Sequence, residues 1–379
     1  MDVFRSLEAL ASTIKTLEMH TSGEPTRIII AGYPTLEGNT LLEKRRYASE
    51  TPEIDEIRKR LMHEPRGHEG MYGAILVPET ELTLSGQADI GVLFCHNEGY
   101  STMCGHATIA LGRFLVDTHD IDVFPMRQTL HNRKHDEGFS TEIRLHAPCG
   151  VVYVTVPTTA AGLSDPTKPV QFRSVPSFVS SPKHGVTVDI PSHMIWPKLA
   201  EKQAAKITVD IAYGGAFYAL VSAEELGRTY PPSVILNEDP EARRSLIHPN
   251  ELDMGFLYGV TIIDTSPRPV QDEKTETWLC FFADEQIDRS PTGSCVSAHV
   301  PLAVQQGRLQ MGEWCSYDSF LSTQYPGNAF RGRAVERTEK GYIVEVEGYA
   351  HYTGASSFVA SEKVVDRMGE GFELKIPLL

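Results

Sequence analysis

Two segments of the chain share one pattern, in which a helix start is followed by residues that are apolar on nearly every side. The first segment is residues 100–116 and the second is residues 288–298. A helix with almost no polar face belongs inside a core. The pattern therefore predicts two buried helices, one in each half of the chain.

Both helix starts combine a capping residue with small residues. Thr102 is placed to cap the first helix, which would put Cys104 at its second position. In the second segment Ser290 is the expected cap and Pro291 the expected first helical residue. When the two segments are aligned, Thr292 takes the position of Cys104, and a glycine follows each of them.

Runs of β-branched and aromatic residues dominate the rest of the chain and predict strands around each helix. A sheet wrapped around a central helix would bury that helix on every side. Residues 158–169 are rich in turn formers and form the expected linker. We therefore expect an α/β (α+β) protein with two domains, residues 1–160 with a C-terminal return at about 360–379, and residues 161–359.

A few other segments carry weaker patterns. Residues 1–13 predict a short helix or a loose leader, residues 41–62 have helical character, and residues 232–253 predict a partly helical segment. Residues 131–139 are polar and predict an exposed loop. Pro301 lies inside the second buried helix and is expected to kink it or end it early.

The composition is that of an ordinary globular chain, with 41% hydrophobic and 22% charged residues. The net charge of −15 argues against nucleic acids and anionic membrane surfaces as partners. The chain has no signal-peptide pattern and no apolar run of about 18 residues, so we expect a cytoplasmic protein. Neither GxGxxG after a strand nor GxxxxGK[ST] occurs, so no nucleotide cofactor is expected.

The six cysteines form no CxxC pair and no disulfide-dense spacing, which indicates reduced thiols in an intracellular setting. Cys95 and His96 precede Cys104 and His106 closely enough to suggest a zinc site. Their spacing matches no common zinc motif, and the last two would point to different sides of a helix. We expect no metal.

Cys104 is the strongest candidate for chemistry. The positive end of a helix dipole favours a thiolate, which can act as a nucleophile or a general base. The alternative is a small buried core cysteine without a chemical role. Backbone N–H groups at Gly105, His106, Gly293 and Ser294 would cradle one carboxylate if the two helix starts converge.

Two polar residues beside these starts have open roles. Asp288 is either a turn or capping aspartate or a ligand-binding carboxylate. His106 taken alone is more often a hydrogen-bonded structural histidine than an acid or a base. A pocket with carboxylate donors, one thiol and one aspartate would suit a small amino acid with an ammonium group.

Residues 103–106 (MCGH) and 288–293 (DRSPTG) resemble the two active-site motifs of the proline racemase family. Residues 20–25 (HTSGEP), 210–218 (DIAYGGAFY) and 352–358 (YTGASSF) resemble that family too, so the similarity spans nearly the whole chain. The resemblance implies a fold like diaminopimelate epimerase, with two pseudo-symmetric halves, each a mostly antiparallel sheet around a central helix. It also implies a cofactor-independent site between the halves and a homodimer.

The resemblance assigns roles to the candidate residues. Cys104 is the base, and Asp288 contacts the ring nitrogen of the substrate. The carboxylate is held by Gly105, His106, Gly293 and Ser294. Racemases and epimerases of the family have a cysteine in both motifs, one for each face of the α-carbon, whereas this chain has Thr292 in the second.

A Cys/Thr pairing resembles the dehydratase members of the family, which remove water from trans-3-hydroxy-L-proline to give pyrroline-2-carboxylate. The chain is thus expected to be a hydro-lyase. Cys295 is a substitute thiol for the second face, but three helical positions displace it by about 4.5 Å along the axis. The alternatives are a proline racemase or 4-hydroxyproline 2-epimerase that uses Cys104 with Cys295 or water, and a non-catalytic amino-acid-binding protein.

Overall fold

The chain is represented by a computed structural model, which describes residues 13–192, 206–226, 239–266, 274–283, 286–359 and 370–373, with a few single positions between or before these ranges. Two compact units make up the chain. The first comprises residues 1–102, 106–170 and 349–379, and the second residues 103–105 and 171–348. The helix or leader expected at residues 1–13 and most of the return expected at 360–379 lie outside the described residues.

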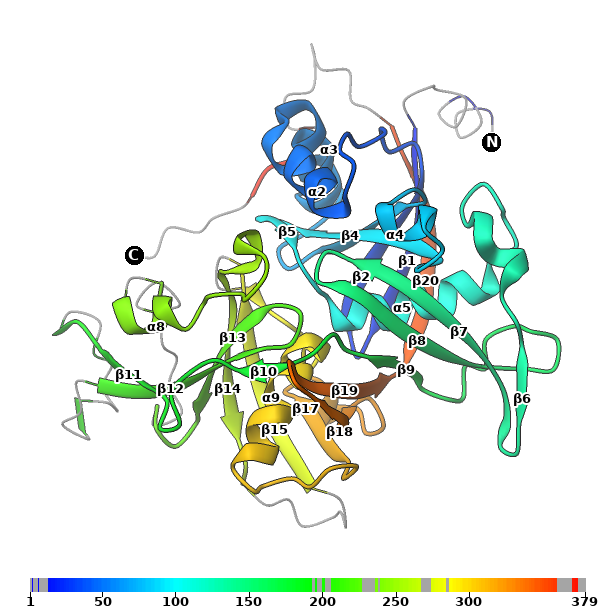
Figure 1. The fold of residues 1–379 in the computed structure, drawn as a ribbon. Helices are drawn as coiled ribbons and strands as arrows, with labels where there is room; N and C mark the ends of the chain where they lie inside the picture. Colours follow the sequence, from blue (N-terminus) through cyan, green and yellow to red (C-terminus); the bar gives the residue numbers. More distant parts are fainter. Residues whose placement is uncertain are drawn as a thin grey trace. The chain divides into compact units, whose positions relative to one another are not determined.

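The first unit is built on a mixed sheet with the order β20–β1–β2–β3–β4–β7–β8 (Figure 1). The pairs β2–β3 and β4–β7 are parallel, and the other neighbours are antiparallel. Strand β5 pairs with β4, and β6 pairs with β7. The strands are β1 (Ile14–Thr21), β2 (Glu24–Ala31), β3 (Tyr72–Val77), β4 (Ile90–His96), β5 (Gly99–Ser101), β6 (Arg133–His135), β7 (Gly138–Ala147), β8 (Gly150–Thr158) and β20 (Ala350–Phe358).

Helix α5 (Gly105–Asp117) is the first of the two expected buried helices. Its apolar residues are almost completely buried, as the sequence predicts. Gly112 packs so closely on the sheet that a Cβ there would lie 2.5 Å from Val154 Cγ1 of β8. On another side the Arg113 guanidinium donates to the carbonyl of Ala350 in β20. Strands from both edges of the sheet therefore contact this helix.

Residues 41–62 are helical, as the sequence predicts, and form two helices. Helix α2 (Leu41–Glu50) is capped by Thr51, which has an extended backbone, and α3 (Pro52–Met62) begins at the next residue. Proline cannot continue a helix but suits the first helical position, so the break lies where the sequence places Pro52. The other helical segments of this unit are α4 (Glu81–Leu84) and the 3₁₀ turn η1 (Pro125–Thr129).

The second unit is also built on a mixed sheet with two parallel pairs of strands. Its order is β11–β12–β13–β14–β15–β17–β18–β19–β9, with β13–β14 and β15–β17 parallel. Strand β10 pairs with β12, and β16 with β15. The strands are β9 (Val170–Arg173), β10 (Phe178–Val179), β11 (Val186–Asp189), β12 (Lys206–Tyr213), β13 (Phe217–Ser222), β14 (Leu257–Asp264), β15 (Lys274–Phe282), β16 (Gln286–Ile287), β17 (Cys315–Ser319), β18 (Phe330–Thr338) and β19 (Gly341–Gly348).

Helix α9 (Gly293–Gln305) is the second buried helix and contacts β10, β12, β13, β18 and β19 (Figure 1). Gly332 of β18 lies so close that a Cβ there would be 2.5 Å from Val296 Cγ1. The helix continues through Pro301, so the expected early end is wrong. Every residue from Gly293 to Ala303 is buried, and this packing outweighs the hydrogen bond that proline removes.

The boundary between the units differs in part from the one expected. Strand β8 ends at Thr158 and β9 begins at Val170, so residues 158–169 do connect two strands. Strand β20, which the sequence placed in the second half, pairs with β1 and belongs to the first unit. In the partly helical segment 232–253 the described elements are α8 (Pro240–Arg244) and the 3₁₀ turn η3 (Leu252–Met254). The second unit also contains the turn η4 (Ser322–Gln324).

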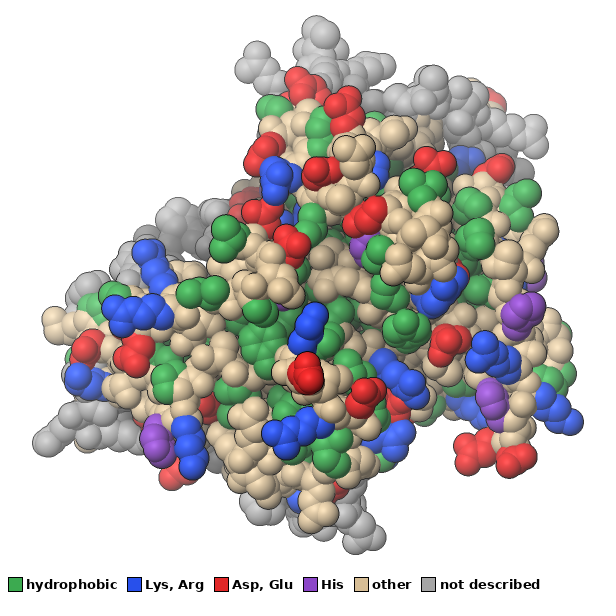
Figure 2. All heavy atoms as spheres, in the orientation of Figure 1, with side chains coloured by type: hydrophobic (Ala, Val, Ile, Leu, Met, Phe, Trp, Pro, Cys, Tyr) green, Lys and Arg blue, Asp and Glu red, His purple; other side chains and the backbone are tan. Residues whose placement is uncertain are grey.

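The polar segment 131–139 is exposed, as predicted, but it forms part of a hairpin in which β6 pairs with β7. All three residues of β6 are exposed. Figure 2 shows basic and acidic side chains interspersed over the visible face of the molecule. No helix within the described ranges is long and apolar enough to span a membrane.

Candidate functional site

The first helix start is anchored by a loop that leaves β5. The Cys149 N–H donates to the carbonyl of Thr102, 3.2 Å away, and the Tyr72 hydroxyl contacts the Ser101 hydroxyl. Cys104 follows as the residue immediately before α5 and is only 4% exposed. It therefore lies at the positive end of the helix dipole, one residue ahead of the helix, where a thiolate is favoured.

His106 lies in the first turn of α5 and is buried. Its backbone carbonyl accepts a hydrogen bond from the Thr21 hydroxyl at 3.0 Å. Its ring lies edge-on to that of Tyr72, with centroids 4.7 Å apart. Thr21 belongs to the segment 20–25, so one of the motifs of the sequence holds the backbone of another.

The second helix start is organised by Asp288, which follows β16. One oxygen of its carboxylate accepts the Ser290 N–H at 2.7 Å, and the other accepts the Thr292 hydroxyl at 2.6 Å. The Ser290 hydroxyl accepts the Thr292 N–H at 3.1 Å. Asp288 is 5% exposed, so this loop is fixed by buried hydrogen bonds. The turn role weighed for Asp288 is present in the structure.

Thr292 has a left-handed backbone, with φ of 59°. For a β-branched residue this conformation is a genuine outlier, and such outliers persist only where surrounding contacts hold them. Here Asp288 and Ser290 supply those contacts. The sequence shows that residue 292 is a threonine, but no local pattern predicts its left-handed backbone.

The helix boundaries correct the expected capping. Helix α9 begins at Gly293 with Thr292 as its N-cap, so Ser290 is not the cap and Pro291 is not the first helical residue. Cys104 likewise precedes α5 instead of occupying its second position. The left-handed backbone of Thr292 cannot continue a right-handed helix, so α9 starts after it.

The two glycines after Cys104 and Thr292 meet. Residues 103–105 pack with the second unit, and there Gly105 lies against Gly293. A Cβ on Gly105 would lie 2.5 Å from Gly293 Cα, and one on Gly293 would lie 3.0 Å from Gly105 Cα. Neither position accepts a side chain without backbone movement. The sequence motifs that carry Cys104 and Thr292 are thus adjacent through their glycines.

Cys295 lies in a different environment from Cys104. It is fully buried on α9, with its sulfur 3.1 Å from the Thr261 hydroxyl. Burial, with Cys280 nearby, raises the pKa of its thiol well above the ordinary value. Cys95 and Cys149 are also disfavoured as thiolates, because burial raises the pKa of each to about 12.

Replacing Cys295 with alanine is expected to leave the catalytic rate unchanged within about twofold, because the sealed thiol cannot reach a ligand as a base. The free energy of unfolding should fall by about 1 kcal/mol, since a small side chain and its contact with Thr261 are lost. Steady-state kinetics and urea unfolding measure the two effects. A tenfold loss of activity in a folded variant would indicate that Cys295 acts as a catalytic thiol after all.

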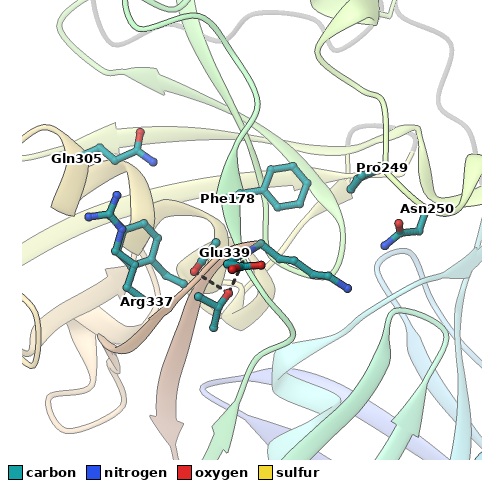
Figure 3. A pocket seen from close by; sticks show the side chains of 10 residues that line it. Phe178, Pro249, Asn250, Gln305, Arg337 and Glu339 are labelled. Carbon is teal, nitrogen blue, oxygen red and sulfur yellow. Dashed lines mark hydrogen bonds between the residues drawn. The ribbon is translucent and has the colours of Figure 1, made fainter.

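Other parts of the second unit are separate from these motifs. A pocket of about 610 Å³ is lined by residues that include Phe178, Gln305 and Arg337 (Figure 3). It contains none of the predicted site residues and touches α9 at its far end, at Gln305. Among the residues that the structure describes, no three His, Cys, Asp or Glu side chains cluster as metal ligands.

Comparison with known proteins gives a match over most of the chain. The profile of a family described as proline racemase matches residues 16–373. A trans-L-3-hydroxyproline dehydratase of Xenopus tropicalis is 42% identical over 375 residues, which cover 96% of this chain and 95% of that one. A trans-3-hydroxy-L-proline dehydratase of Homo sapiens is 40% identical over the same shares. One of Colwellia psychrerythraea is 34% identical over 96% and 93% of the two chains.

Solved structures share the fold. A hydroxyproline epimerase from Agrobacterium vitis, with bound trans-4-hydroxy-L-proline, has a TM-score of 0.75 at 22% identity and covers 96% of this chain and 95% of that one. A probable proline racemase from Agrobacterium radiobacter has a TM-score of 0.74 at 23% identity, with 95% and 96% covered. These likenesses confirm the expected fold class, a mixed α/β protein with extensive sheet and few helices.

Proposed function

Because the chain belongs to the proline racemase family, we propose that it is a cofactor-independent hydro-lyase acting on trans-3-hydroxy-L-proline. The product is pyrroline-2-carboxylate. Relatives from vertebrates and a bacterium, 34–42% identical over nearly the whole chain, support the proposal by their names.

The observation that carries this proposal is the state of Thr292. Its hydroxyl donates to Asp288 over 2.6 Å, so the proton is committed to that carboxylate. A threonine hydroxyl is also a poor base at neutral pH. The face of the ring opposite Cys104 therefore has no sulfur and no free proton donor at this position, as a dehydratase with one base requires.

In this reaction Cys104 is the base, and Thr292 fills the place of a second cysteine. The carboxylate of the substrate is held by Gly105, His106, Gly293 and Ser294. Asp288 contacts the ring nitrogen. An ionised carboxylate has about four lone-pair sites, and Asp288 accepts two hydrogen bonds within the chain, which leaves acceptor capacity for an ammonium group.

The ring geometry favours elimination on one face. In the trans isomer the 3-hydroxyl lies opposite the carboxylate and thus on the same face as the α-hydrogen. The Cys104 thiolate removes the α-proton, the carbanion electron pair forms the ring double bond, and the C–O bond breaks. The thiol returns its proton to the departing hydroxide as water. The enamine tautomerises to the cyclic imine, and hydrogen-bond donors to the carboxylate stabilise the charge that develops there.

Incubation with the isomers of 3- and 4-hydroxyproline tests the proposal. Pyrroline-2-carboxylate is expected from trans-3-hydroxy-L-proline, detected by mass spectrometry. An α-deuterated substrate should react more slowly, because the C–H bond breaks in the chemical step. Binding of the substrate without imine formation would indicate an amino-acid-binding protein instead. An imine formed with no isotope effect in single-turnover kinetics would argue against proton abstraction.

Isomerisation is the second candidate, because the fold neighbours include a hydroxyproline epimerase. A racemase would convert L-proline into D-proline and incorporate solvent deuterium in heavy water. The proposed dehydratase forms no D-proline, since Thr292 cannot deliver a proton to the second face. Chiral chromatography of the proline pool distinguishes the two activities.

We also propose that the protein is a cytoplasmic homodimer. The family resemblance supports the dimer, and the described cysteines, all of them free thiols, fit a reducing compartment. Light scattering of the purified protein and fractionation of the source cells test the two statements.

A further inference from the structure

The segment 210–218 has no role in the reaction described so far. It forms the end of β12, a tight turn and the start of β13, and it packs on the first turns of α9. Gly214 makes this approach possible, because a Cβ there would lie 2.3 Å from the Ser294 carbonyl oxygen and 2.4 Å from the Ala298 nitrogen. The turn therefore touches the helix backbone directly beside Ser294.

Tyr218 extends from β13 to the side chain of Ser294. The two hydroxyl oxygens are 2.6 Å apart, and both side chains are buried. The ring of Tyr258 packs edge-on against that of Tyr218, with centroids 5.7 Å apart. Burial raises the pKa of Tyr218 well above its ordinary value, so the phenol keeps its proton at neutral pH.

Two buried hydroxyl protons share this contact, and either hydroxyl can be the donor. If Ser294 donates, the phenol proton has no acceptor among the described residues and the Ser294 proton is turned away from any ligand. If Tyr218 donates, the Ser294 proton is available to a substrate carboxylate. With a carboxylate bound at Ser294, only this second direction gives both buried protons an acceptor.

We propose that Tyr218 is a positioning residue that holds the Ser294 hydroxyl as a donor to the substrate carboxylate. This inference rests on the proposed function, in which Ser294 helps to bind that carboxylate. Donation from Tyr218 polarises Ser294 and strengthens its own outward hydrogen bond. The benefit is greatest in the transition state, where the carboxylate gains charge as the α-proton leaves.

Tyr218→Phe removes one hydroxyl and keeps the ring. We expect kcat/KM for trans-3-hydroxy-L-proline to fall about tenfold, with kcat bearing most of the loss, because a transition-state contact is weakened. Tyr317→Phe is the matched control, since Tyr317 is another fully buried tyrosine of the second unit, packed on Trp278. It should keep kcat/KM within about twofold of the wild type.

A double-mutant cycle with Ser294→Ala shows whether Tyr218 acts through Ser294. Ser294→Ala should lower kcat/KM at least as much as Tyr218→Phe, and adding Tyr218→Phe to it should have no further effect. Full activity in either single variant, or additive losses in the double variant, would overturn the inference alone. A wild-type protein that forms no imine would overturn the proposed function, and this inference with it.

Discussion

Replacing Cys104 with serine is expected to abolish dehydration, with kcat/KM falling by at least about 10³-fold. A serine hydroxyl is a far weaker acid than a thiol and stays protonated at neutral pH, so it cannot remove the α-proton. The helix dipole that favours a thiolate cannot make up this difference. Cys95, Cys149 and Cys295 are poor substitutes for this base, since burial raises the pKa of each thiol.

The measurement is the rate of imine formation, with Cys295→Ala as the control because it removes a thiol from the other buried helix. Ligand binding is followed separately, as the rise in the melting temperature of the protein that L-proline causes. Cys104→Ser should retain this rise, because the residues that we propose hold the carboxylate are unchanged. Dehydration at the wild-type rate by Cys104→Ser would show that the base has been assigned wrongly.

The sequence predicts the two central helices because their pattern is local. Residues that are apolar on all sides have no stable place on a surface, so α5 and α9 had to be buried. The glycine that the two motifs share also has a simple physical cause, because Gly105 and Gly293 pack backbone against backbone and leave no room for a side chain. These features depend on side-chain size and polarity, which the sequence states outright.

Other features depend on contacts between distant residues. The left-handed backbone of Thr292 is held by Asp288 and Ser290, so propensity alone pointed to a helix start two residues too early. Strand β20 returns to pair with β1, and no local pattern announces a partner at the other end of the chain. Pro301 reads as a helix breaker, but the burial of α9 overrides that preference.

The link between Tyr218 and Ser294 lies between these cases. The sequence marks the segment 210–218 as similar to a family motif, yet it does not say which residue faces α9. Strand alternation and the close approach of Gly214 decide this, and both appear only in the folded chain. A tyrosine that follows a double glycine by a few residues is the signal that could have suggested it.

Replacing Gly214 with alanine is expected to damage stability and catalysis together. The new Cβ would lie 2.3 Å and 2.4 Å from two backbone atoms of α9, and backbone cannot move aside as a flexible side chain does. Overpacking of this kind costs about 3 kcal/mol in the free energy of unfolding. Because the displaced backbone carries Ser294, we also expect kcat/KM to fall about 10²-fold, as misplacement by about 1 Å can produce.

Gly354→Ala is the matched control, because a Cβ at this exposed position in β20 meets no atom within 4 Å. It should unfold at the wild-type urea concentration and keep the wild-type rate, so that any loss in Gly214→Ala reflects contact with α9. Kinetics of the folded fraction, taken well below the unfolding transition, separate lost activity from lost protein. Gly214→Ala with normal stability and rate would mean that the turn does not press on the first turns of α9. The placement of Tyr218 beside Ser294 would then lose its structural basis.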